Sequence, residues 1–219
     1  MRHYHCIPFV TLHNGGACHN PDSEQFLDEA VHSTADFIEL DVQILRSGYL
    51  MFSHDPVVFD DSGIPFQDAL KFFSGTDKRI NIDVKNVKAL VPIAKLLKKT
   101  GYIEKTVLTG LSILDIIKEK QHLTGLSYMW NITAREMMKS PEIIVRDFLE
   151  NRCTALNADF RSIDNSFLRM CCRYNIPVSL WTVDEKAFMQ KRYAVYNITT
   201  NDIQLFNDAY LRSGEKLSV

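Results

Sequence analysis

The chain has 219 residues, of which 46% are hydrophobic and 24% charged, and its formal net charge at pH 7 is −2. These values are typical of a globular protein with one sizeable core, so we expect a single domain over residues 1–219. A nearly neutral chain without a basic stripe is not expected to bind nucleic acid. No apolar run approaches the roughly 20 residues of an integral membrane segment, and the first apolar run is too short for a signal peptide. Five cysteines without C-x-x-C spacing indicate free thiols and a cytoplasmic location.

The first predicted unit is a strand followed by a helix. The apolar run over 6–12 reads as a buried strand that delivers His13 and Asn14 to its carboxyl end. Helical spacing of apolar residues follows over 22–32, and the next strand is predicted over 37–41. This order of elements is that of a β-α unit leading into a second strand.

A hairpin after the second strand carries the first chemical signal. Glu39 and Asp41 are two residues apart, so both carboxylates point to the same face of the strand. The return arm is predicted over 49–52 and leads to His54. A turn centred on Arg46-Ser47 would place His54 opposite Glu39, and one centred on Ser47-Gly48 would place it opposite Asp41. Either register predicts a site for a hard divalent cation with a proton-transfer group beside it.

From residue 79 onward, strands and helices alternate regularly, after an amphipathic turn predicted over 67–73. We predict strands over 79–85, 105–111, 125–131, 154–159, 176–183 and 194–200, and helices over 87–99, 112–120, 141–150, 162–174, 185–192 and 203–211. With the two earlier strands, eight strands precede helices, which indicates an α/β fold, a single-domain (β/α)8 TIM barrel with a β-hairpin after the second strand. The active site of such a barrel lies at the carboxyl ends of its strands, where Asp83, Lys85 and Trp181 also fall.

Seven motifs, in order along nearly the whole chain, resemble the glycerophosphodiester phosphodiesterase family. They are His13-Asn14-Gly15, Pro21-Asp22-Ser23, IELDV, GYLMFS with His54-Asp55, NIDVK, LWTVD and TTND. The resemblance implies a TIM barrel, related to the phosphoinositide-specific phospholipases C, that hydrolyses glycerophosphodiesters to glycerol 3-phosphate and an alcohol with a divalent cation. Many members insert a small segment between the second and third barrel strands, and the short passage between Asp55 and Arg79 implies a reduced insertion here.

The resemblance also implies roles for particular residues. These are general acid-base catalysis for His13 and His54, metal binding for Glu39, Asp41 and Asp83, and substrate binding for Lys85 and Trp181. Oxygen ligands favour Mg2+ or Ca2+ over zinc. A cation and a lysine beside a phosphodiester should stabilise the charge of the transition state. The sequence does not indicate which histidine is the acid and which the base, or whether water or a substrate hydroxyl attacks first.

The chain departs from the family pattern at several of these positions. Asn14 stands where the family usually has an arginine that contacts phosphate. Because the related phospholipases C have a His-Asn pair whose asparagine helps to bind metal, Asn14 is expected to be a metal or substrate ligand. Asp22 and Asp83 replace the usual glutamates, and Asp184 replaces an asparagine. These changes leave the reaction class unaltered and the alcohol headgroup open.

Two alternatives to a glycerophosphodiesterase remain on the sequence alone. One is a phospholipase D-like enzyme that acts on lysophospholipids or sphingomyelin, which would favour an apolar rim. The other is a catalytically inactive barrel that binds phosphodiesters. In each case the partner is a small molecule, and the sequence does not indicate an oligomeric state.

Overall fold

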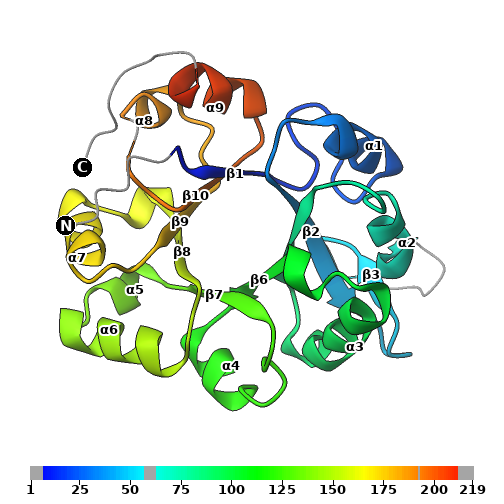
Figure 1. The fold of residues 1–219 in the computed structure, drawn as a ribbon, viewed down its shortest axis with the longest axis horizontal. Coiled ribbons are helices and arrows are strands. Elements are labelled where there is room, and N and C mark those ends of the chain that lie inside the picture. Colours follow the sequence, from blue (N-terminus) through cyan, green and yellow to red (C-terminus); the bar gives the residue numbers. More distant parts are fainter. Residues whose placement is uncertain (1–6, 57–62, 192, 212–219) are drawn as a thin grey trace.

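Eight parallel strands form a closed barrel in the computed structural model, which describes residues 7–56, 63–191 and 193–211. Each strand pairs with the next one around the ring, and the first strand pairs with both the second and the last, which closes the barrel (Figure 1). The strands are β1 (Phe9–Leu12), β2 (Phe37–Ile44), β5 (Arg79–Val84), β6 (Thr106–Leu111), β7 (Ser127–Asn131), β8 (Ala155–Asp159), β9 (Val178–Trp181) and β10 (Asn197–Thr200). The predicted single-domain TIM barrel is confirmed.

The helices surround the barrel in chain order (Figure 1). They are α1 (Glu24–His32), α2 (Phe66–Lys71), α3 (Leu90–Thr100), α4 (Ile113–Lys118), α5 (Ala134–Met137), α6 (Pro141–Glu150), α7 (Asn165–Arg173), α8 (Lys186–Met189) and α9 (Ile203–Tyr210), with short 3-10 turns at Val87–Ala89, Ile103–Lys105 and Phe160–Ser162. Local sequence explains several starts: Ser112 and Asp115 form a capping box at α4, and Pro141 occupies the first turn of α6. The short α5 was not predicted, and α8 is shorter than the predicted 185–192.

The hairpin after β2 is present, but both predicted registers are wrong. Strand β3 (Leu50–Phe52) pairs antiparallel with β2 so that Val42 lies opposite Phe52. The turn is therefore centred on Ser47 alone, and the backbone N–H of Ser53 donates to the Asp41 carbonyl at 3.0 Å. An odd number of loop residues shifts the pairing by one position, so His54 is aligned with neither Glu39 nor Asp41. In the described part of the passage to β5, strand β4 (Ile64–Pro65) pairs with β3 and precedes α2.

An apolar plug fills the barrel at the amino ends of its strands. Phe37, Val107, Met129 and Ala155 form a buried cluster there, and Phe9 packs against it. The guanidinium of Arg79, at the start of β5, lies 4.3 Å from the ring centres of both Phe9 and Phe37. Because this end is filled, polar groups of the barrel interior are reached from the carboxyl ends of the strands.

Two further sequence predictions concern thiols and membrane segments. Cys18, Cys153, Cys171 and Cys172 are free, as predicted, and Cys6 lies outside the described residues. Among the helices of the described ranges, none combines the length and apolar character needed to traverse a bilayer.

Candidate active site

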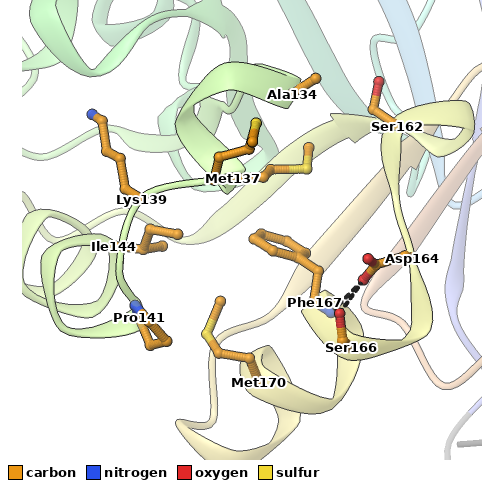
Figure 2. A pocket seen from close by; sticks show the side chains of 11 residues that line it. Ala134, Met137, Lys139, Pro141, Ile144, Ser162, Asp164, Ser166, Phe167 and Met170 are labelled. Carbon is orange, nitrogen blue, oxygen red and sulfur yellow. Dashed lines mark hydrogen bonds between the residues drawn. The ribbon is translucent and has the colours of Figure 1, made fainter.

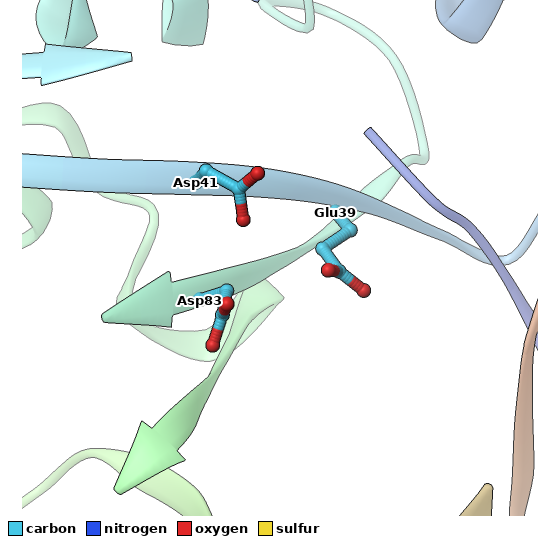
Figure 3. A group of neighbouring side chains, drawn as sticks. All are labelled: Glu39, Asp41 and Asp83. Carbon is cyan, nitrogen blue, oxygen red and sulfur yellow. The ribbon is translucent and has the colours of Figure 1, made fainter. Parts of the chain in front are cut away.

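Three carboxylates meet at the carboxyl ends of β2 and β5. Parallel pairing of the two strands sets Asp41 beside Asp83. Glu39 precedes Asp41 by two residues on β2, so its side chain points to the same face (Figure 3). One oxygen of each residue lies within 4.8 Å of the others. Glu39 and Asp41 are buried, with exposed fractions of 8% and 1%. The two-residue spacing in the sequence therefore produces the cluster, and strand pairing adds its third member.

The cluster concentrates negative charge inside the protein. Burial, followed by repulsion from Asp83 and Asp41, raises the pKa of Glu39 well above its ordinary value. Burial also raises the pKa of Asp83, and the negative charge of Asp41 adds to that effect against the opposing attraction of Lys85. The pKa values of Glu39 and Asp83 are thus raised because the attraction of Lys85 does not offset burial and the repulsion between carboxylates.

Lys85 is the cation that the fold supplies to the cluster. Its Nζ lies 2.5 Å from Oδ2 of Asp83 and 3.0 Å from Oδ1 of Asp41. Burial by itself would lower the pKa of Lys85, but the charges of Asp83 and Asp41 outweigh it and hold the pKa above its ordinary value. Lys85 is therefore a permanent positive charge between two carboxylates at the rim.

The donor set fits a hard divalent cation. Oδ1 of Asp41 is buried and makes no hydrogen bond of acceptable geometry, although Lys85 Nζ lies 3.0 Å away. An unsatisfied buried carboxylate oxygen beside two further carboxylates is a ligand arrangement that Mg2+ and Ca2+ prefer. Glu39, Asp41 and Asp83 can hold such an ion, whose charge would balance the cluster.

His13 is brought to the cluster by the end of β1. Its backbone N–H donates to the Thr200 carbonyl at 3.0 Å, which extends the pairing of β1 with β10. Its Nε2 lies 3.8 Å from Oε1 of Glu39, and its Nδ1 lies 2.9 Å from Oδ1 of Asn201. The ring is 30% exposed, so it stands at the solvent side of the carboxylates.

Asn14 lies beside the carboxylates as a hydrogen-bond donor. Its Nδ2 donates to Oδ2 of Asp41 at 2.8 Å and to Oδ1 of Asp22 at 2.6 Å. Its Oδ1 accepts the backbone N–H of Asp22 at 3.0 Å. The amide therefore turns its nitrogen, not its oxygen, toward the cluster, an arrangement that orients Asp41 more directly than it ligates a cation.

His54 lies at the rim and has no direct contact with the cluster. Its side chain is 53% exposed, and within the described ranges the one carboxylate near its ring is Asp55, with Oδ1 3.0 Å from Nδ1. Its backbone N–H donates to Oδ2 of Asp22 at 2.8 Å. Because Asp22 also binds Asn14, the fold links His54 to Asp41 through two intervening side chains. Asp22 adopts a left-handed φ of 60°, which aspartate tolerates better than most residues.

The remaining predicted substrate residue, Trp181, ends β9 and is 37% exposed. It therefore lies on the same end of the barrel as the carboxylates. The sequence reasoning assigned no role to Asp22, Asp184 or Asn201, all of which contact site residues or their partners. Each of these residues belongs to one of the seven motifs, which is the signal that could have identified it. Its contacts, however, depend on which strand ends are neighbours in the barrel, and the motifs do not give that order.

A separate hollow of about 350 Å³ lies on the flank of the barrel between α5, α6 and α7 (Figure 2). Met137, Ile144, Phe167 and Met170 give it a largely apolar lining. None of the predicted site residues borders it. This hollow is consequently distinct from the carboxylate cluster.

Comparison with known proteins finds no matching family model. A curated glycerophosphodiester phosphodiesterase of Caldanaerobacter subterraneus subsp. tengcongensis is 23% identical across 88% of this chain and 93% of its own length. The glycerophosphodiester phosphodiesterase structure from Thermotoga maritima has a TM-score of 0.73 and 19% identity, covering 93% of this chain and 99% of its own. A phosphodiesterase of Oleispira antarctica, solved with the product sn-glycerol-3-phosphate, has a TM-score of 0.75 and 12% identity, covering 93% of this chain and 96% of its own.

At these identities the solved structures establish the shared fold alone. The sequence relative adds a match over most of both chains, and the structure brings the motif residues Glu39, Asp41 and Asp83 together in one cluster of the barrel. Motifs, fold and sequence relative agree in their likeness to glycerophosphodiester phosphodiesterases.

Proposed function

We propose that the protein hydrolyses glycerophosphodiesters to glycerol 3-phosphate and an alcohol with the help of Mg2+ or Ca2+. The curated relative is named a glycerophosphodiester phosphodiesterase, and the Oleispira antarctica phosphodiesterase was solved with the product sn-glycerol-3-phosphate. The observation that carries the proposal is the cluster of Glu39, Asp41 and Asp83 with Lys85 and His13 at one end of the barrel. A cation held there would offset the negative charge that a phosphodiester gains as it is attacked.

The chain's own residues supply the other requirements of the reaction. Lys85 stands where its ammonium can contact a non-bridging phosphate oxygen, which stabilises the added charge. The two imidazoles of His13 and His54 divide the proton transfers, one taking the proton of the attacking hydroxyl and one protonating the leaving oxygen. Asn14 orients Asp41, and the exposed face of Trp181 contributes to the pocket for the alcohol.

The direct test is release of glycerol 3-phosphate from glycerophosphocholine and glycerophosphoethanolamine, with EDTA, Mg2+ and Ca2+ compared side by side. Release that depends on the cation supports the proposal and ranks the two headgroups. A parallel reaction with lysophosphatidylcholine tests the lipid alternative. A folded protein that releases product from none of these substrates contradicts hydrolysis and favours the phosphodiester-binding alternative.

A matched pair of variants tests the cluster itself. D83N removes one charge from the cluster without changing its size, whereas E104Q removes an exposed charge elsewhere. We expect D83N to raise the cation concentration needed for half-maximal activity at least tenfold and E104Q to leave it unchanged. Equal cation requirements for D83N and the unmodified protein would remove Asp83 from the proposed ligand set.

A further inference from the structure

We infer that Asp22 is a positioning residue, whose carboxylate holds the backbone of His54 at the rim and ties it through Asn14 to Asp41. The inference deepens the proposed function and rests on it for the reaction. It assigns a role to a residue outside the predicted site. It also explains how a histidine with no direct contact to the carboxylate cluster keeps a defined place beside it.

The loop between β1 and α1 fixes the backbone of Asp22. The loop turns back on itself, because the His19 N–H donates to the Gly15 carbonyl at 3.1 Å. A Cβ atom on Gly15 would lie 3.1 Å from the Pro21 nitrogen, so the two ends of the loop are in close contact. Asp22 leaves the loop with a φ of 60° and precedes Ser23, the N-cap of α1. Its side chain is therefore presented from a rigid turn.

One oxygen of Asp22 belongs to a reciprocal pair with Asn14. The Asn14 Oδ1 accepts the Asp22 N–H at 3.0 Å, and its Nδ2 donates to Oδ1 of Asp22 at 2.6 Å and to Oδ2 of Asp41 at 2.8 Å. Turning this amide over would bring its oxygen against two carboxylates and its nitrogen against an N–H. The amide is 4% exposed and fixed in orientation, so Asp22 and Asp41 are held by a single donor group.

The other oxygen of Asp22 reaches His54, 32 positions further along the chain. Oδ2 accepts the His54 N–H at 2.8 Å, and a bond to a charged acceptor is stronger than one between neutral groups. On its other side, the His54 carbonyl accepts from Nε2 of Gln43 at 3.2 Å. The imidazole itself is 53% exposed, so its place at the rim is set by these backbone contacts more than by packing of the ring.

The chemistry of a carboxylate suits this role, because two donors approach two different oxygens. D22N tests the point without disturbing the loop, since asparagine also tolerates a left-handed φ. The amide that D22N introduces has one acceptor for two donors. An unmet donor costs more in a buried place than at the exposed rim, so we expect the oxygen to stay with Asn14. The His54 N–H would then face an amide nitrogen and lose its partner.

The first measurement is hydrogen exchange of the His54 N–H by NMR, in the absence of substrate and cation. We expect this N–H to exchange at least about tenfold more slowly than an unprotected amide, and D22N to raise its rate at least about fivefold. The Ser53 N–H, which donates to the Asp41 carbonyl at 3.0 Å, is the internal control and should keep its rate. Unprotected exchange at His54 in the unmodified protein, or an unchanged rate in D22N, would overturn the inference.

Kinetics then connect the position of His54 to activity. We expect D22N to lower kcat at least about tenfold, with KM and the cation concentration for half-maximal activity changed less than about threefold. E24Q is the matched control, because it removes an exposed carboxylate two residues further along and should change none of these quantities. A D22N variant with unchanged kcat would contradict the positioning role.

A double variant separates positioning from a general effect on the fold. If Asp22 acts through His54, then D22N/H54A should have the same residual kcat as H54A within about twofold. A loss from D22N that is equally large with and without the imidazole would overturn the inference. Should D22N fail to fold, the exchange rate of the His54 N–H in the unmodified protein still decides. Expected exchange rates in a protein that hydrolyses none of the substrates would contradict the proposed function alone.

Discussion

At the scale of a single residue, the exposed side chain of His54 is expected to matter for activity and little for stability. Its side chain is 53% exposed and pairs with Asp55, while its backbone N–H binds Asp22. Removing the ring leaves the backbone contact intact. We expect H54A to lower kcat at least about 100-fold while the melting temperature changes little, because the imidazole supplies a proton transfer and no core packing. Steady-state kinetics and thermal unfolding measure the two effects.

D55N is the matched control for H54A, since it removes the charge that faces the ring without removing the ring. It should retain most of the activity. Near-normal turnover by H54A would exclude the proposed acid-base role of His54.

Glu39 makes the stability of the metal-free protein depend on pH. Its pKa is raised above 4.5 by burial and by Asp83 and Asp41, so the folded state retains a proton that the unfolded state has released. Stability is therefore lost as pH rises from about 4.5 through the folded-state pKa. We expect the melting temperature of the EDTA-treated protein to fall over this range, and to fall less in E39Q.

A divalent cation should reverse this loss, because it pairs with the ionised carboxylates and binds only the folded state. E104Q, which alters an exposed side chain, should follow the pH dependence of the unmodified protein. Identical pH profiles for E39Q and the unmodified protein would show that Glu39 does not titrate abnormally.

At the scale of an element, Gly110 makes room for Asp83. The residue has a left-handed φ of 79° at an irregularity in the pairing of β6 with β7. A Cβ atom there would lie 2.5 Å from Oδ1 of Asp83 and 2.6 Å from the Val84 carbonyl oxygen. We expect G110A to destabilise the fold by roughly 2 kcal/mol or more and to weaken cation binding, as measured by urea unfolding and calorimetric titration.

The control is G125A, because Gly125 has a similar φ of 81° and no atom lies within 4 Å of the added Cβ. Its cost comes from backbone strain alone, so the difference between the two variants isolates the steric effect at Asp83. Equal costs and equal cation affinities would show that β6 leaves more room beside Asp83 than its geometry indicates.

At the scale of the whole molecule, folding divides the thiols into two classes. Burial raises the pKa of Cys153 and Cys171 to about 12, whereas Cys18 and Cys172 are exposed. A shift from 9.0 to about 12 lowers the thiolate fraction about a thousandfold at pH 8. Among the four thiols of the described residues, we expect iodoacetamide to label Cys18 and Cys172 in the native protein; in urea it should label all five cysteines of the chain.

Cys171 and Cys172 form an internal control, since they are neighbours on α7 and differ in burial. Peptide mass mapping after timed labelling distinguishes them. Equal native labelling rates for these two thiols would contradict the packing of α7 against the barrel.

The sequence by itself determined the barrel and much of its site. Alternating apolar strands and amphipathic helices specify β-α units, because each pattern buries apolar surface in one way. Two-residue spacing put Glu39 and Asp41 on one face, and placement at strand ends predicted that Asp83 would join them. These features are local or follow from the fold class, so they can be predicted without coordinates.

Only the tertiary structure decided the contacts that depend on register and on neighbouring strand ends. The hairpin turn centres on Ser47, which leaves His54 out of register with both carboxylates. The Asn14 amide turns its nitrogen toward Asp41 because its oxygen accepts the Asp22 N–H. Asn201 reaches His13 across 188 positions of sequence because the last strand closes the barrel against the first. A single extra loop residue or the turn of one amide decides such contacts, and neither leaves a signal in the spacing of residues along the chain.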